Sequence, residues 1–257
     1  MTIRLYGSWF SPFARKVALA LELKGLAYEA VDALTRDAHA ELARVNARAE
    51  VPVLQDGDVL VVNSSDIIQY LEWRTPERPL YPAALAERVT ARALERLADS
   101  RLDAIMTDCS FWLWAEREDK VPDGLLEAGQ RDIDGIFAEL EDVLAARPAP
   151  WPFGAPNGAP GFVECAFFPH LAALRWMGFT LDERFPATRG WLQAMRAHPV
   201  FENDLKRTAA FVKELPNRNY ERRRLFWRGD RIEWLLSRGF HPWFAQEIES
   251  GRAVFPA

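Results

Sequence analysis

The sequence has little cysteine and no long apolar run. Only Cys109 and Cys165 occur among 257 residues, so a disulfide framework is not expected. No stretch approaches the roughly eighteen uninterrupted apolar residues that a membrane-spanning helix needs. Residues 1–6 are strand-like and lack the basic start and apolar run of a secretory signal. We therefore expect a cytoplasmic protein that does not bind a membrane.

An excess of positive charge is also missing. The formal net charge of −5 gives no general attraction to nucleic acid or to an anionic membrane. The four histidines are scattered without metal-ligand spacing, so we expect neither a metal nor a nucleic-acid partner. Aromatic residues, by contrast, are plentiful. Ten Trp and sixteen Phe favour an aromatic-lined pocket or interface.

Signals for strands and helices alternate over the first third of the chain. β-Branched and aromatic runs predict strands, and apolar residues at helical spacing predict helices. The expected order is strand 3–6, helix 11–23, strand 28–31, helix 37–45, strands 51–54 and 59–62, and a helix capped by Ser64. Asp56-Gly57 between the last two strands is a strong hairpin signal. The order βαβαββα predicts an α/β domain over residues 1–75.

Prolines mark the end of this domain. Three of them fall within residues 74–82, which predicts a linker at 76–82. Beyond it we find helical periodicity and no strand. The expected helices are 84–115, 124–146, 162–177, 188–197 and 200–215. We therefore predict an all-α domain over residues 83–216.

Residues 217–257 form an extension rich in arginine and aromatic residues. Arg222, Arg223 and Arg224 are consecutive, a run that also occurs where proteins contact nucleic acid. Because acidic residues are interleaved with them, we favour an extension that packs on the helical domain through its aromatic side chains. Two short helices are expected, near 230–237 and 242–250.

Four segments, in order and at matching spacing, resemble glutathione transferases, especially the serine-type tau and zeta classes. They are residues 11–21 (SPFARKVALAL), which resemble the family's opening helix; 46–54 (NARAEVPVL), which resemble Asn-Pro-x-Gly-x-Val-Pro-x-Leu; 57–71, which resemble Gly-x-x-Leu-x-Glu-Ser-x-Ala-Ile-x-x-Tyr-Leu; and 78–82 (RPLYP), which resemble the interdomain linker. The resemblance is close over the first third of the chain and only general over the helical domain.

The resemblance implies a thioredoxin-like N-terminal domain followed by an all-α domain, with glutathione as co-substrate and no metal. It implies a homodimeric detoxification enzyme that transfers the glutathione thiolate to a small, electrophilic, partly apolar molecule. The runner-up is a transferase-fold protein that has lost catalysis and binds a protein partner. A further hypothesis makes residues 217–257 a lid or dimer arm that shapes the substrate site.

Ser11 is the expected catalytic residue. A free thiol is only a few per cent ionised at neutral pH, and the thiolate is the nucleophile. A hydroxyl at a helix N-terminus can donate its proton to the sulfur anion, assisted by backbone N–H groups and the helix dipole. The alternative is that Ser11 only caps the helix. Ser8 and Tyr6 are the fallback hydroxyls.

The resemblance also implies the residues that bind glutathione: Phe13, Glu50, Val51, Pro52, Asn63 and Ser64. A cis Val51-Pro52 bond would offer the Val51 backbone to the cysteinyl unit like an added strand; the alternative is a trans proline that begins an edge strand. Ser64 and the adjacent amides suit the γ-glutamyl carboxylate; the alternative is a helix cap alone.

Two positions depart from the family pattern. Asn63 stands where the family usually has Glu or Gln, and an amide accepts a hydrogen bond more weakly than a carboxylate does. Glu50 stands where a Gln, Lys or Arg often lies near the glycyl end, and it would repel the glycyl carboxylate unless it points away. Candidates for the missing cation are Arg48, Arg44 and His39.

The helical domain supplies the other expected features. The second-substrate pocket is expected to use aromatic residues, with core packing as the alternative for each of them: Phe10, Phe111, Trp112, Trp114 and Trp176. Gly161 and Glu164 retain half of a capping box, whose role would be structural. Neither cysteine stands at the nucleophile position, so we expect both to be buried apolar residues.

Overall fold

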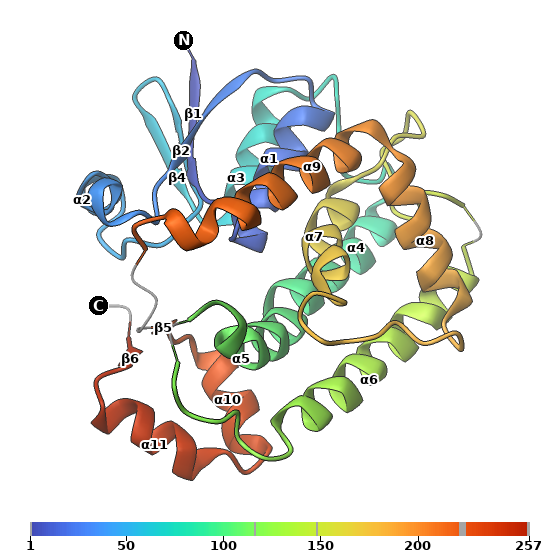
Figure 1. Cartoon of the computed structure of the whole chain (residues 1–257). Helices are drawn as coiled ribbons and strands as arrows, with labels where there is room; N and C mark the ends of the chain where they lie inside the picture. Colours follow the sequence, from blue (N-terminus) through green and yellow to red (C-terminus); the bar gives the residue numbers. More distant parts are fainter. Residues whose placement is uncertain (1, 116, 148, 221–224, 256–257) are drawn as a thin grey trace. The chain divides into compact units, whose positions relative to one another are not determined.

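The computed structural model describes residues 2–115, 117–147, 149–220 and 225–255 (Figure 1). The chain forms two compact units. The first combines residues 1–95, 149–172 and 190–220, and the second combines 96–148, 173–189 and 221–257. Each unit joins segments from distant parts of the sequence, so the domain boundaries expected at residues 76–82 and 217 stay predictions. The arginine run 222–224 lies outside the described residues.

A four-stranded mixed sheet lies in the first unit. Its strands are β1 (Ile3–Gly7), β2 (Tyr28–Asp32), β3 (Val53–Asp56) and β4 (Val59–Val62). They are arranged β2-β1-β3-β4, with β1 parallel to β2 and the other pairs antiparallel. Helices α1 (Pro12–Leu23), α2 (Arg36–Val45) and α3 (Ser64–Arg74) complete the predicted βαβαββα order. This is the thioredoxin-like arrangement that the sequence predicted.

Local chemistry explains how α1 follows β1. Ser11 is the N-cap of α1, Pro12 occupies the first turn, and Gly25 with a φ of 65° follows the helix end. At the end of β1, Gly7 lies so close to α1 that a Cβ there would stand 2.8 Å from the Cβ of Ala14. The first turn of the helix therefore packs directly on the strand. The core between these elements is aliphatic and fully buried, and includes Leu5, Val17, Leu19, Leu21, Leu54, Ile67 and Ile68.

Between α3 and residue 217, all regular elements of the described residues are helical, as predicted. Its elements are α4 (Leu85–Leu97), the π-helical turn η1 (Ala98–Leu102), α5 (Asp103–Trp114), α6 (Leu125–Ala145), α7 (Phe162–Ala173), α8 (Pro186–Ala197), α9 (Pro199–Glu214) and the 3-10 turn η2 (Leu215–Asn217). The single helix expected over 84–115 is interrupted by η1. No helix of the described ranges combines the length and apolar character needed to cross a membrane.

The extension contains the two predicted helices, α10 (Gly229–Ser237) and α11 (His241–Glu249). It also contains β5 (Leu225–Phe226) and β6 (Ala253–Val254), which pair in parallel. The prediction of no further strand was wrong, because strands of two residues are too short to show alternation. Trp227 is 1% exposed and packs on Phe244, and Trp243 lies 5.3 Å from Trp112 of α5, measured between ring centroids. Aromatic packing on a helix of its own unit is thus confirmed for this part of the extension.

Candidate functional site

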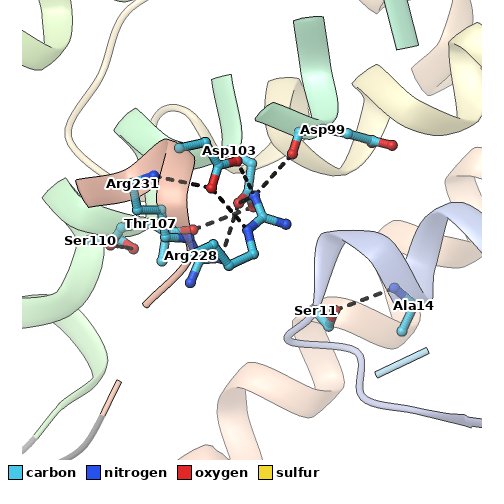
Figure 2. A network of polar contacts seen from close by, with 9 residues as sticks. Ser11, Ala14, Asp99, Asp103, Thr107, Ser110, Arg228 and Arg231 are labelled. Carbon is cyan, nitrogen blue, oxygen red and sulfur yellow. Dashed lines mark hydrogen bonds and ion pairs between the residues drawn. The ribbon is translucent and has the colours of Figure 1, made fainter. Parts of the chain in front are cut away.

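Ser11 lies at the junction of the β1–α1 loop and α1, 9% exposed. Its Oγ accepts a hydrogen bond from the Ala14 amide at 3.3 Å (Figure 2). Its own amide donates to the Ser8 carbonyl at 2.9 Å. The capping role considered from the sequence is therefore present. Because a hydroxyl has one proton and two lone pairs, accepting from Ala14 leaves the proton available for a second partner.

Ser8, one of the fallback hydroxyls, belongs to a different network. Its Oγ lies 3.4 Å from the Tyr220 hydroxyl, which donates to Asp32 at 2.5 Å. Arg218 also donates to the Asp32 carboxylate at 2.7 Å. Burial, together with the hydrogen bond to Asp32, raises the pKa of Tyr220, so this phenol stays protonated. No local sequence pattern indicates this network, because Ser8 and Asp32 are separated from Tyr220 by 212 and 188 positions.

Tyr6, the other fallback hydroxyl, is 2% exposed and lies in β1. Its hydroxyl lies 3.1 Å from a carboxylate oxygen of Glu41 and 3.1 Å from the side-chain oxygen of Gln55, donates its single proton to one of them, and accepts from Arg4. Burial, with the hydrogen bond to Glu41, raises the pKa of Tyr6. The phenol is thus held in a polar cluster on the sheet, which matches the expectation of a packed residue.

A cavity of about 110 Å³ lies beside the β1–α1 loop, within the first unit. Its wall includes Ser8 and Trp9 of the loop, Asp32 of β2, Phe211 of α9, and Arg218. The Arg207 guanidinium stacks over the Trp9 ring at 4.6 Å. The loop that carries Ser11 therefore borders a small cavity that is lined mainly by apolar residues.

The Val51-Pro52 peptide bond is cis, as the resemblance implied. β3 begins at Val53 rather than at Val51, two residues later than expected. Among the hydrogen bonds of the described residues, none uses the Val51 amide or carbonyl. Val51 therefore lies just before the hydrogen-bonded part of β3, and its amide and carbonyl are available to bind a ligand. Phe13, on the first turn of α1, has its ring edge-on to His170 at 6.5 Å.

The start of α3 differs from the prediction by one residue. Asn63 is the N-cap, with a φ of 72°, and Ser64 is the first helical residue. The Asn63 side chain makes no capping hydrogen bond and donates instead to Asp66 at 3.1 Å. The expectation that Ser64 caps the helix was wrong, because Asn tolerates the left-handed backbone that the cap requires here. The cap itself thus supplies no side-chain acceptor to the first amides of α3.

A buried lysine that the sequence analysis did not single out contacts Ser64. Lys16 of α1 is 1% exposed, and its Nζ donates to the Oγ atoms of Ser64 and Ser65, both at 3.3 Å. It forms an ion pair with Glu95 of α4 at 2.5 Å. A signal existed: Lys16 lies three and four positions before Leu19 and Ala20, so helical spacing places a charge on the apolar face.

Glu50 is paired within its own loop. Arg48 donates to both carboxylate oxygens of Glu50, at 2.8 and 3.2 Å. This pair neutralises the acid that would repel a glycyl carboxylate, and it commits Arg48, one of the candidate cations. Arg44 and His39, both on α2, make no ion pair among the described residues.

Three of the five aromatic residues expected in the second-substrate pocket lie together at the end of α5, in the second unit. Phe111 is 1% exposed, and its ring centroid lies 5.9 Å from that of Trp112 and 5.1 Å from that of Trp114. Trp176 is 42% exposed, and Phe10 belongs to the first unit. Phe111 is thus a core residue, which was the alternative considered for it.

The same unit holds a buried acidic network that sequence patterns did not indicate. Asp103 accepts hydrogen bonds from Arg228 at 2.7 Å and from Arg231 at 3.0 Å, and Figure 2 shows the three side chains converging. Asp108 is buried, and its carboxyl oxygens have no hydrogen-bond partner within the described part of the chain. Burial raises the pKa of Asp108 well above its usual value. The network ties α10 to α5.

Both cysteines are buried, and burial raises the pKa of each thiol. They are therefore poor nucleophiles, as expected. Glu164 accepts from the Gly161 amide at 2.7 Å and from the Trp191 indole at 3.1 Å, which confirms the structural capping contact. Across the described ranges, no three His, Cys, Asp or Glu side chains are grouped so that they could hold a metal.

Comparison with known proteins identifies the family. Residues 5–79 match the model of the glutathione S-transferase N-terminal domain, and residues 123–194 match that of the C-terminal domain. Glutathione S-transferase 1 from Dianthus caryophyllus is 42% identical over 218 residues, covering 82% of this chain and 95% of that protein. A glutathione S-transferase from Triticum aestivum is 30% identical over 141 residues, covering 54% of this chain and 64% of that protein, so the match spans less than two thirds of that relative.

A solved structure is also similar to this chain in both sequence and fold. Maleylacetoacetate isomerase from Anaeromyxobacter dehalogenans is 32% identical, with a TM-score of 0.61, over 79% of this chain and 90% of the other. The chain belongs to the glutathione S-transferase family. The fold class and family expected from the sequence are confirmed, and the comparisons support the expected enzyme class, a glutathione transferase.

Proposed function

We propose that this chain activates glutathione at Ser11 and transfers its thiolate to a small, electrophilic, partly apolar molecule. The observation that carries the proposal is the Ser11 hydroxyl at the N-terminus of α1. Its oxygen accepts from the Ala14 amide, and its proton is left to donate to a sulfur anion. Membership of the glutathione S-transferase family supports the choice of thiol.

The energetic demand on this site is modest. Lowering the thiol pKa by about two units corresponds to about 2.7 kcal/mol of differential stabilisation. A hydroxyl donor and the positive end of a twelve-residue helix both favour the anion over the neutral thiol. With the thiolate formed, holding it in contact with the electrophile supplies the rest of the catalysis.

We assign the parts of glutathione to separate groups of the first unit. The Val51 amide and carbonyl pair with the cysteinyl backbone, next to Pro52 and with Phe13 nearby on α1. The γ-glutamyl carboxylate binds at Ser64 and the first amides of α3, and Asn63 accepts from the γ-glutamyl amine. Because Glu50 is neutralised by Arg48, the glycyl carboxylate is left to Arg44 or His39.

The electrophile is assigned to aromatic surroundings. The cavity beside the β1–α1 loop, with Trp9 and Phe211 in its wall, supports an apolar substrate group near the loop of Ser11. Phe10, which belongs to the same unit, remains a proposed contact. The roles predicted for Trp112, Trp114 and Trp176 stay predictions, and Phe111 is a core residue.

We further propose a cytoplasmic homodimer with a role in detoxification. The family supports this assembly, and so do the exposed apolar side chains of β4, the last strand in the sheet order, where Val59, Leu60 and Val62 are each 43–46% exposed. Sedimentation equilibrium should give twice the mass of one chain; a monomer at micromolar concentration would contradict the homodimer.

The decisive experiment compares two helix caps. Ser11→Ala removes the proposed donor together with a capping bond of 3.3 Å, and Thr35→Ala removes a capping bond of the same length, from the Ala38 amide, at α2. Both should lose about 1 kcal/mol of stability. Only Ser11→Ala should lower kcat/KM for glutathione with 1-chloro-2,4-dinitrobenzene, by at least about ten-fold.

The wild type provides the reference for this comparison. Millimolar glutathione should raise its unfolding midpoint, because the ligand binds the native state alone. Equal activities of Ser11→Ala and Thr35→Ala would remove Ser11 from the mechanism. A wild type that neither binds glutathione nor turns over the electrophile would favour the non-catalytic, partner-binding alternative.

A further inference from the structure

A buried cation lies beneath the start of α3. The Lys16 side chain is 1% exposed and that of Glu95 is 3% exposed, with 2.5 Å between Nζ and Oε1. Lys16 also donates to Ser64 and Ser65, the first two residues of α3. Arg92 donates to the second oxygen of Glu95 at 2.6 Å. The charge of Lys16 is thus balanced, and its place is fixed from three elements, α1, α3 and α4.

The two serine hydroxyls are not equivalent. Ser65 accepts from Lys16 and donates its own proton to Glu95 at 2.9 Å. Ser64 accepts from Lys16, and its hydroxyl has no acceptor among the described residues. An ammonium group has three donors and no acceptor. The Ser64 proton therefore cannot point to Lys16 and is directed elsewhere.

We propose that Lys16 is a positioning residue, which orients the Ser64 hydroxyl as a donor to the γ-glutamyl carboxylate of glutathione; this inference rests on the proposed function. The ammonium fills one lone pair of the Ser64 oxygen, so that the hydroxyl proton is presented to the ligand. The uncapped N-terminus of α3 adds its own positive potential beside this hydroxyl. Lys16 does not touch the ligand and acts through Ser64.

The same helix provides a matched control. Lys24 of α1 is also 1% exposed, pairs with Glu72 of α3 at 2.7 Å, and donates to the carbonyls of Thr75 and Arg78. It therefore has the burial and the carboxylate partner of Lys16, but it lies at the other end of α3. Lys24→Met reports the effect of losing a buried lysine without touching Ser64.

The test measures dissociation constants by titration calorimetry of the full chain. The probes are S-hexylglutathione and S-hexyl-cysteinylglycine, which lacks the γ-glutamyl group. Lys16→Met should weaken binding of the first about ten-fold, equivalent to about 1.4 kcal/mol, and leave binding of the second unchanged. Lys16→Arg should restore most of the loss. Lys24→Met should lower the unfolding midpoint and change neither constant.

A double-mutant cycle tests whether Lys16 acts through Ser64. In a Ser64→Ala background, Lys16→Met should add less than about two-fold, because the effects of coupled residues do not add. Full additivity, or an equal loss for both probes, would show a structural role and overturn the inference. If Lys16→Met does not fold, the double variant Lys16→Gln/Glu95→Gln, which removes both charges, replaces it, and its dissociation constants for the two probes are compared in the same way.

Failure of the inference is separable from failure of the proposed function. A wild type that does not bind S-hexylglutathione overturns both. A wild type that binds it, with Lys16→Met binding equally well, overturns the inference alone.

Discussion

The guanidinium of Arg15 faces the carboxylate of Asp204 inside the first unit. The Nε atom of Arg15 lies 3.1 Å from one oxygen and 3.2 Å from the other, and the side chains are 6% and 0% exposed. Arg15 also donates to the Pro169 carbonyl. One buried ion pair therefore links the first turns of α1 to α9 and α7. It fixes the helix that carries Ser11.

Breaking this pair should destabilise the fold. Asp204→Leu leaves a buried guanidinium without its counterion, and we expect a loss of about 3–5 kcal/mol in the free energy of unfolding. Arg15→Met/Asp204→Leu should recover much of it, because no unpaired charge remains. Urea unfolding followed by circular dichroism measures both. A double variant less stable than Asp204→Leu would refute this account.

The extension should contribute to the stability of the second unit through Trp227. Trp227→Ala leaves a cavity between Trp243 and Phe244, at a cost of about 3–5 kcal/mol. The control is Trp73→Ala, because Trp73 is 74% exposed and its removal should cost less than about 0.5 kcal/mol. Differential scanning calorimetry should resolve the two. Equal midpoints for the variants would mean that the extension does not support the unit.

Asp132 should make stability dependent on pH in acid. Burial raises the pKa of its carboxyl, but hydrogen bonds from Arg238 and the Trp234 indole outweigh that effect and lower it below the ordinary 3.8. The unfolded chain then binds more protons, so this contribution is present above about pH 4 and lost as the pH falls through the folded-state pKa. The free energies of unfolding of the wild type and of Asp132→Asn should differ at neutral pH and converge at low pH. A difference that does not change with pH would contradict the assignment.

The two thiols should react slowly with thiol reagents in the native protein. Cys109 and Cys165 are 2% and 0% exposed, and burial raises the pKa of both, so little thiolate forms. We expect slow reaction with a disulfide reagent in buffer and two rapid equivalents in guanidinium chloride. A fast equivalent in buffer would expose an accessible thiolate and reopen the question of the nucleophile.

The fold was largely predictable because its signals are local. The Ser11-Pro12 helix start, the Asp56-Gly57 hairpin and the β-branched runs each report nearby backbone geometry. Ser64 was misassigned as a cap by one residue, since Asn63 takes a left-handed backbone that the sequence alone did not reveal. The strands β5 and β6 were missed because two residues have no measurable period.

The candidate site was predictable only where a motif is contiguous. Ser11 and the Val51-Pro52 segment follow from such motifs. Lys16 with Glu95 and Asp32 with Tyr220 meet across 79 and 188 positions, and no local pattern encodes these distances. The pairing of Arg48 with Glu50, although close in sequence, depends on rotamers that composition does not fix.

Gly7 has no side chain, so a search for chemically reactive residues would not find it. Yet a single methyl group at this position would collide with Ala14, one turn into the helix that Ser11 begins. The absence of a side chain at Gly7 thus allows the first turn of α1, and with it the Ser11 hydroxyl, to lie close to β1. Saturation mutagenesis at position 7, selected for turnover, should return glycine almost alone, although no ligand needs to touch it.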